Sequence, residues 1–374
     1  MILPPAPDLP AGSRLAQRRL LVRWLQCGLD EAPPPPPPES EEALSLLVPL
    51  AIRAGLAGLL QRGLGRGGVT LPPAPAQALA RATRTTLAHN LLLLRDAATL
   101  ARRLRVHGVP GLFIKGAALL QTVIPDPSCR AMADLDLLVR PADAGLARVA
   151  AREAGYRFAH PRRAPSRLAH TKQNLVHEVG GQPLRLEIHT HPDGLGHRGP
   201  PTGELLGRAQ ATRLDGEPFL VPSPADSALL LAVNWTTDLF AERLKDCLDL
   251  AALVQRGGLD LADSRPRARR WRIGRTWDAL LRRAAILGAL TPDQSPLEIT
   301  DDGHKDIGKA GLSSHLSRLA GAPGPLPALL RPFLAEGTRD ALLLLARVGW
   351  RRVGDGWAAR HEGTIVPVVT WPLA

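Results

Sequence analysis

Two aspartates, Asp134 and Asp136, stand two residues apart at the head of an apolar run in this 374-residue chain. If the run forms a β-strand, alternate side chains share a face and lie about 6.6 Å apart along the strand. Both carboxylates then point the same way and repel one another unless a cation lies between them. This arrangement favours one or two Mg²⁺ ions, with Mn²⁺ as the alternative. Taken alone, an Asp-x-Asp pair is more often two solvated acids at a strand end.

A third acid falls on a second predicted strand. Apolar and polar side chains alternate over residues 184–189, which places Glu187 and His189 on one polar face. If this strand pairs beside the first, Glu187 joins the two aspartates as a third carboxylate. His189 could contact nucleotide or metal, and a structural hydrogen bond explains it equally well.

A predicted turn could face a phosphate group. The β-prone residues 109–114 precede Lys115 and Gly116, and a helix is predicted to follow. Backbone amides at a helix N-terminus bind anions, glycine permits close approach to the backbone, and lysine adds a positive charge. We therefore expect this turn to lie on the same side of the sheet as the acids.

The elements that must position these residues form a mixed β/α block between helical flanks. The predicted fold class is α+β, a small mixed β-sheet core with helical N- and C-terminal flanks. The expected regions are an N-terminal helix with a Pro-rich linker (1–38), a helical region (39–107), the core (108–222), a second helical region (223–290) and a loop-rich C-terminal extension with one helix (291–374).

Hydrophobic periodicity gives finer predictions within these regions. Helices are expected at 14–28, 40–64, 77–107, 117–122, 141–155, 225–256, 277–289 and 326–347. Strands are expected at 109–114, 135–139, 175–179 and 184–189, the last two joined as a hairpin by Gly180-Gly181. The proline run at 33–38 predicts an extended polyproline II spacer.

The composition limits the choice of partners and compartment. The net charge is +12, but only five of the 47 basic residues are lysine, and the arginines are spread along the chain. Aromatic residues make up 3%, so the stacking platforms of a nucleic-acid binder are missing, which argues against a nucleic-acid partner. Three distant cysteines, no visible secretory signal and no apolar run long enough to span a bilayer predict a soluble, cytoplasmic protein. The histidines His170, His177 and His191 lack a spacing that specifies zinc.

Three segments, taken in their order along the chain, resemble those of a known protein family. Residues 113–120, 130–139 and 186–189 are similar to the uncharacterised bacterial nucleotidyltransferase family of the DNA polymerase β-like nucleotidyltransferase superfamily. The resemblance covers about residues 45–290. The chain departs from the usual motifs at two positions near the site. The usual Gly-Ser turn is Lys-Gly here, and the Trp that usually follows the Glu-Ile-His motif is Thr190.

The resemblance implies roles for individual residues. Asp134 and Asp136 would bind the metal ions, and Glu187 would hold metal or activate the acceptor. Lys115 and Gly116 would face the triphosphate.

Two basic residues outside the turn are assigned in the same way. Arg130 would neutralise developing phosphate charge. Lys245 would contact the nucleotide, although an i, i+4 ion pair with Asp249 explains it at least as well.

The implied reaction is the attack of an acceptor oxygen on the α-phosphorus of a nucleoside triphosphate such as ATP, with release of pyrophosphate. The partners would then be a nucleoside triphosphate, Mg²⁺ or Mn²⁺, and an acceptor that could be a small molecule, sugar phosphate, peptide or protein. Two alternatives stay open: a catalytically degenerate binding module in a biosynthetic complex, and nucleic-acid processing.

Overall fold

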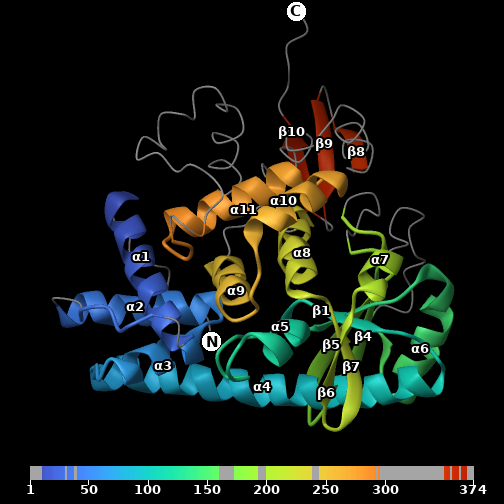
Figure 1. Cartoon of the computed structure of the whole chain (residues 1–374), viewed down its shortest axis with the longest axis horizontal. Coiled ribbons are helices and arrows are strands. Elements are labelled where there is room, and N and C mark those ends of the chain that lie inside the picture. The colour runs from blue at the N-terminus through green and yellow to red at the C-terminus, as the bar shows by residue number, and fades with distance from the viewer. Residues whose placement is uncertain are drawn as a thin grey trace, which may run out of the picture.

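Helices surround a seven-stranded mixed sheet, so the predicted α+β class is confirmed (Figure 1). The structure is a computed structural model of the chain. It describes residues 11–29, 32–37, 40–159, 172–192, 199–237, 244–291, 294, 349–353, 356–361 and 364–368. In this described part of the chain, every helix is too short or too polar to cross a lipid bilayer.

Four helices precede the sheet: α1 (Ala11–Gly28), α2 (Glu41–Ala54), α3 (Ala57–Arg66) and α4 (Pro73–Val106). Ser40 starts α2 as predicted, because its side chain accepts a hydrogen bond from the Ala43 amide at 3.1 Å. The single helix expected at 40–64 is wrong. Gly55 turns to φ 70°, a left-handed conformation that ends α2, and α3 begins two residues later.

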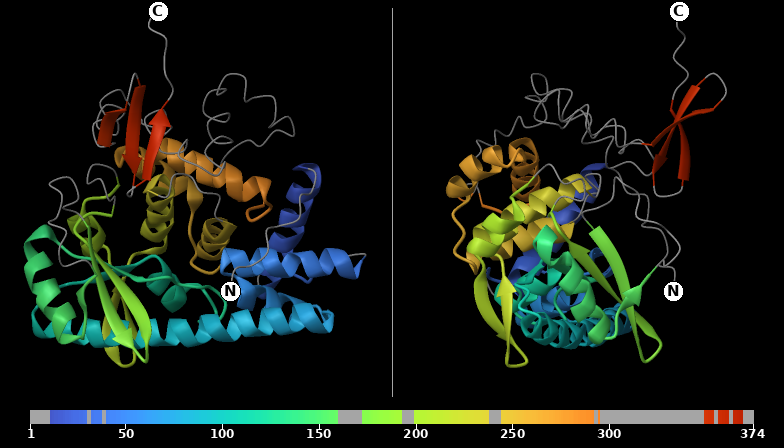
Figure 2. Two further views of the ribbon diagram at one scale, coloured as in Figure 1. Left: turned by 180° about the vertical axis from the view of Figure 1, so that it is seen from behind. Right: turned by 90° about the vertical axis from the view of Figure 1, so that its right-hand side faces the viewer.

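The long helix α4 connects the two halves of the structure. Its 34 residues span about 50 Å, and it runs along both the N-terminal helices and the sheet (Figures 1 and 2). It packs against α2 and α3 at one end and against α6 (Ala144–Glu153) and the sheet at the other. A side chain in the middle of α4 can therefore contact segments that are far from it in sequence.

The sheet has the strand order β3-β4-β5-β2-β1-β7-β6. Its strands are β1 (Leu112–Ile114), β2 (Leu135–Leu138), β3 (Arg157–Phe158), β4 (Lys172–Val179), β5 (Gln182–His189), β6 (Gln210–Leu214) and β7 (Glu217–Val221). At its centre, β2 pairs antiparallel with β1 and parallel with β5. The β4–β5 hairpin is confirmed, with positive φ at Gly180 and Gly181. The β6–β7 hairpin was not predicted, although Asp215-Gly216 is a typical turn pair with φ 54° and 79°.

The other helices are α5 (Gly116–Thr122), α7 (Thr202–Gly207), α8 (Pro224–Thr237), α9 (Leu244–Gln255), α10 (Leu261–Arg270) and α11 (Gly274–Ile286). The helix predicted at 141–155 begins as a 3₁₀ turn, Pro141–Asp143, before α6. Sequence periodicity missed α10 because the segment is rich in arginine and contains Pro266. The helix predicted at 326–347 lies outside the described residues.

Most of the C-terminal extension lies outside the described residues, but its described segments from residue 349 onward form a three-stranded antiparallel sheet. Its strands are β8 (Gly349–Val353), β9 (Gly356–His361) and β10 (Thr364–Val368). The prediction for this region did not include strands.

Aliphatic residues fill the core, as expected from the scarcity of aromatic residues. The few large aromatic side chains join neighbouring elements. Phe113 on β1 stacks on Phe219 on β7, with ring centroids 4.1 Å apart. This contact fixes β1, and with it the turn that begins at Lys115.

Candidate active site

The acidic residues come together where β2 lies between β1 and β5. In the parallel β2–β5 pairing, Asp136 is the register partner of Glu187. In the antiparallel β1–β2 pairing, Asp136 is opposite Ile114, the residue before Lys115. The sheet therefore brings the Lys-Gly turn and the two acidic strands to one place, as the sequence predicts.

Asp136 is the centre of a chain of polar contacts. Its Oδ1 lies 2.6 Å from Lys115 Nζ and 2.9 Å from His189 Nε2. The same His189 nitrogen is 3.4 Å from Glu187 Oε2, and Glu187 Oε1 is 2.5 Å from Lys172 Nζ. Only 3% of Asp136 is exposed, so its charge is screened by these neighbours rather than by water.

These contacts set the protonation of the buried groups. Burial acts to raise the pKa of Asp136, but Lys115 and His189 outweigh it and hold that pKa well below its usual range. The pKa of Glu187 is lowered too, because hydrogen bonds from His189 and Lys172 outweigh burial and the nearby charge of Asp136. Burial acts to lower the pKa of Lys115, and the surrounding carboxylates, Asp136 first, raise it.

Asp134 differs from the other two acids. Burial, together with the negative charges of Asp136 and Glu187, raises its pKa to about 6 from an ordinary 3.8. It stands just before β2 and is partly exposed. Two neighbouring carboxylates disfavour the ionised form of Asp134. A cation placed among the three acids would therefore stabilise the ionised form of Asp134 most.

The pKa of Asp134 predicts a pH-dependent stability. The pKa of Asp134 in the folded protein lies above its value in the unfolded chain, so a proton on this carboxyl stabilises the folded state. This stabilisation is fully present below about pH 4 and is lost as the pH rises to about 6. In EDTA, we expect Asp134→Asn to become more stable relative to the parent as the pH rises from 4 to 7. The relative gain should be on the order of 2 kcal/mol, measured by urea unfolding at each pH.

The same pair of proteins provides the control for this effect. Saturating Mg²⁺ should stabilise the parent more at pH 7 than at pH 5, and should stabilise Asp134→Asn less than the parent. A difference in unfolding free energy between the two proteins that did not change with pH would contradict a raised pKa at Asp134.

Three of the polar groups are arranged to hold a cation. Ligand atoms of Asp136, Glu187 and His189 all lie within 4.8 Å of one another. Two carboxylate oxygens and an imidazole nitrogen suit a divalent cation such as Mn²⁺, and the carboxylates suit Mg²⁺. This group includes Asp136 and Glu187 from the predicted set of metal ligands. Its third member is His189, where Asp134 was predicted.

The turn between β1 and α5 is unusual in its backbone. Lys115 adopts φ 55° and ψ −124°, a region that a non-glycine residue occupies only under constraint. Gly116 is buried, and a Cβ atom there would lie 2.8 Å from both Met132 Cγ and Arg130 Nη1. Close packing against Met132 is therefore sufficient to explain why this position is glycine. The approach of a phosphate would explain it equally well.

Arg130 forms a buried ion pair, and its predicted contact with phosphate stays a prediction. Its Nε and Nη2 donate to the two oxygens of Asp249 on α9, at 2.7 and 2.8 Å, and both side chains are buried. Both carboxylate oxygens of Asp249 are thus bound by Arg130. The Arg130 guanidinium is thus a bidentate partner of Asp249. Lys245 lies half-buried in the first turn of α9, and its contact with nucleotide stays a prediction.

One site residue was missed by sequence reasoning. Lys172 begins β4 and is the register partner of His189, which brings its ammonium group to Glu187. Only the strand register reveals this contact. Of the other histidines, His177 pairs with Asp96 on α4 at 2.8 Å, and His170 lies outside the described residues.

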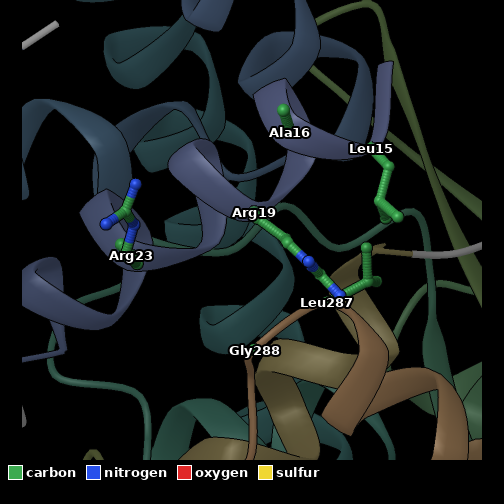
Figure 3. A pocket seen from close by; sticks show the side chains of 6 residues that line it. All are labelled: Leu15, Ala16, Arg19, Arg23, Leu287 and Gly288. Atoms are coloured by element: carbon green, nitrogen blue, oxygen red, sulfur yellow. The ribbon is translucent and has the colours of Figure 1, made fainter. Parts of the chain in front are cut away.

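A cavity of about 490 Å³ lies elsewhere, between α1 and the end of α11 (Figure 3). It is lined by Leu15, Ala16, Arg19, Arg23, Leu287 and Gly288. None of these residues belongs to the acidic strands or to the Lys-Gly turn, so the cavity does not define the candidate site.

The fold and the site together define an α+β protein that gathers carboxylates from adjacent strands around a position fit for a divalent cation. Comparison with known families is more specific, because residues 40–288 match the family described as uncharacterised nucleotidyltransferase. The chain belongs to this family. The match begins at the cap of α2 and ends just after α11, so it includes the sheet and both helical flanks.

Similarity to individual proteins is weak. No curated protein sequence matches the chain. A crystal structure of an antigenic nucleotidyltransferase-like protein from Paracoccidioides brasiliensis is similar over 53% of this chain and 92% of that one, at 14% identity and a TM-score of 0.32. The assignment to the family therefore depends on the family match.

Proposed function

We propose that the protein is a metal-dependent enzyme that transfers a nucleoside monophosphate from a nucleoside triphosphate to an acceptor, releasing pyrophosphate. The observation that carries this proposal is the side-by-side placement of Asp136 and Glu187 on parallel strands, in contact with Lys115 through Asp136. Membership of a nucleotidyltransferase family supports it.

The residues present fit a divalent cation. The ligand atoms of Asp136, Glu187 and His189 are close enough together to bind one ion, and Asp134 is a third carboxylate nearby. These side chains would hold the ion. When bound, the cation would lower the pKa of the acceptor and neutralise charge on the triphosphate.

The chain's own residues would handle the remaining charge and the proton. In the reaction, the acceptor oxygen forms a bond to the α-phosphorus while the bond from that phosphorus to pyrophosphate breaks. Lys115, beside Asp136, would bind a phosphate oxygen of the leaving group. Glu187 would accept the acceptor's proton, while Lys172 fixes its carboxylate from the neighbouring strand. Positioning and electrostatic stabilisation of this kind account for most catalysis at phosphate.

Transfer of label from differently labelled nucleotides tests the proposal. The protein is incubated with Mg²⁺, a host-cell extract and each of the four nucleoside triphosphates, labelled on either the α- or the γ-phosphate. We expect label from the α-phosphate to appear on an acceptor and label from the γ-phosphate to leave as pyrophosphate. The double variant Asp134→Ala/Asp136→Ala should neither transfer the α-label nor release pyrophosphate.

Other outcomes would contradict the proposal in different ways. Equal transfer by the parent and the double variant would remove these aspartates from the chemistry. Metal-dependent binding of the triphosphate without any transfer would favour a degenerate binding module. Transfer of the γ-phosphate would identify a kinase-like reaction instead.

A further inference from the structure

The loop before β2, residues 126–132, connects α5 to the acidic strand and ends two residues before Asp134. We propose that Asn90, in the middle of α4, is a positioning residue that fixes this loop and thereby sets the positions of Asp134 and Asp136. The inference rests on the proposed function, since it assigns Asn90 to the same site.

The side-chain amide of Asn90 binds the loop backbone at three points. Its Nδ2 donates to the carbonyl oxygens of Pro127 at 2.6 Å and of Arg130 at 2.7 Å. Its Oδ1 accepts from the Met132 amide at 3.1 Å. The partners fix the orientation of the amide, because the reversed orientation would place its oxygen against two carbonyl oxygens.

The burial of Asn90 makes these bonds indispensable. The residue is fully buried on a helix whose other buried positions are almost all Leu and Ala. A buried amide destabilises the fold unless its donors and acceptor are bound, and loop carbonyls and amides have the same requirement. Asn90 and the loop therefore satisfy one another's hydrogen-bonding groups in this conformation.

Other contacts hold the same loop at residues before Met132, its last residue. The Ala131 amide donates to the Gly55 carbonyl at 2.8 Å, and a Cβ atom at Gly58 would overlap the carbonyl oxygen of Ser128. With these contacts intact, loss of Asn90 should loosen the loop rather than unfold the protein. Among these contacts, only Asn90 bonds Met132, the residue nearest the aspartates.

Binding of Mn²⁺ to the full chain tests the positioning role. We expect Asn90→Ala to weaken Mn²⁺ binding by about 10- to 100-fold, measured from free Mn²⁺ by electron paramagnetic resonance. The matched control is Leu79→Ala, a buried α4 residue about 16 Å along the helix from Asn90. It should lower the thermal midpoint but leave the Mn²⁺ dissociation constant unchanged. Hydrogen exchange should rise over residues 126–134 in Asn90→Ala alone.

A second variant allows for poor folding of the first. Asn90→Asp keeps the shape and the acceptor for Met132 but loses both donors, so it should also weaken Mn²⁺ binding. Parent-like Mn²⁺ affinity in either Asn90 variant, or an equal loss in Leu79→Ala, would overturn the inference. If the parent itself bound no Mn²⁺, the proposed function would fail first, and the two failures are thus distinguishable.

Discussion

Asp136→Asn should lower nucleotidyl transfer more than about 100-fold while the protein stays folded. The Asp136 side chain contacts both Lys115 of the Lys-Gly turn and His189 of β5. It also belongs to the group of side chains that could bind a cation. Asparagine keeps the size of the side chain but removes the negative charge and one acceptor oxygen. The initial rate of α-label transfer, at saturating Mg²⁺ and nucleotide, measures the effect.

The matched control for this prediction is Asp143→Asn. Asp143 lies seven residues further on, outside the site, and pairs with the exposed Arg140 at 2.7 Å. Its loss should change transfer less than twofold, because an exposed ion pair contributes little to the fold. A rate for Asp136→Asn above half that of the parent, with Mn²⁺ bound as before, would show that β2 does not carry the chemistry.

Much of the candidate site follows from local sequence patterns. Alternation of apolar and polar residues at 184–189 predicts the face of Glu187 and His189, and the Asp-x-Asp spacing predicts the face of the aspartates. The parallel register that pairs Asp136 with Glu187 is seen only in the structure. Such predictions are possible because a strand's period of two residues is a local property.

Contacts that depend on tertiary packing were not predictable. The pattern gives no reason for Lys172 to reach Glu187, because that contact depends on the register between β4 and β5. Asn90 in a long helical pattern resembles any tolerated polar residue, and its partners lie 37 to 42 positions away. In the same way, local spacing gives no sign that Asp249 binds Arg130, which is 119 positions away.

The break between α2 and α3 and the helix α10 were not predicted, for a different reason. Gly55 within a run of helical periodicity gave no signal of its own, although its left-handed φ separates α2 from α3. Arginine-rich α10 has too few apolar positions to show a helical pattern, and its single proline suggested a loop. Packing against neighbouring helices stabilises both segments, and periodicity does not report packing.

Asp249→Asn should destabilise the protein by about 3 kcal/mol, because it leaves the buried Arg130 without its carboxylate. A double variant should be more stable than Asp249→Asn. Replacing both partners with apolar residues, in Arg130→Met/Asp249→Leu, removes the buried charges together and should recover most of that loss. Urea unfolding followed by tryptophan fluorescence measures both, since the chain has seven tryptophans.

The double variant also decides what Arg130 does. Two of its nitrogens are bound by Asp249, so the geometry favours an anchor that joins α9 to the loop before β2. An anchor can be replaced by apolar packing, and we expect the folded double variant to retain transfer within about tenfold of the parent. A phosphate ligand cannot be replaced by methionine. A loss beyond about 100-fold in a stably folded double variant would therefore return Arg130 to the triphosphate, as the family resemblance implies.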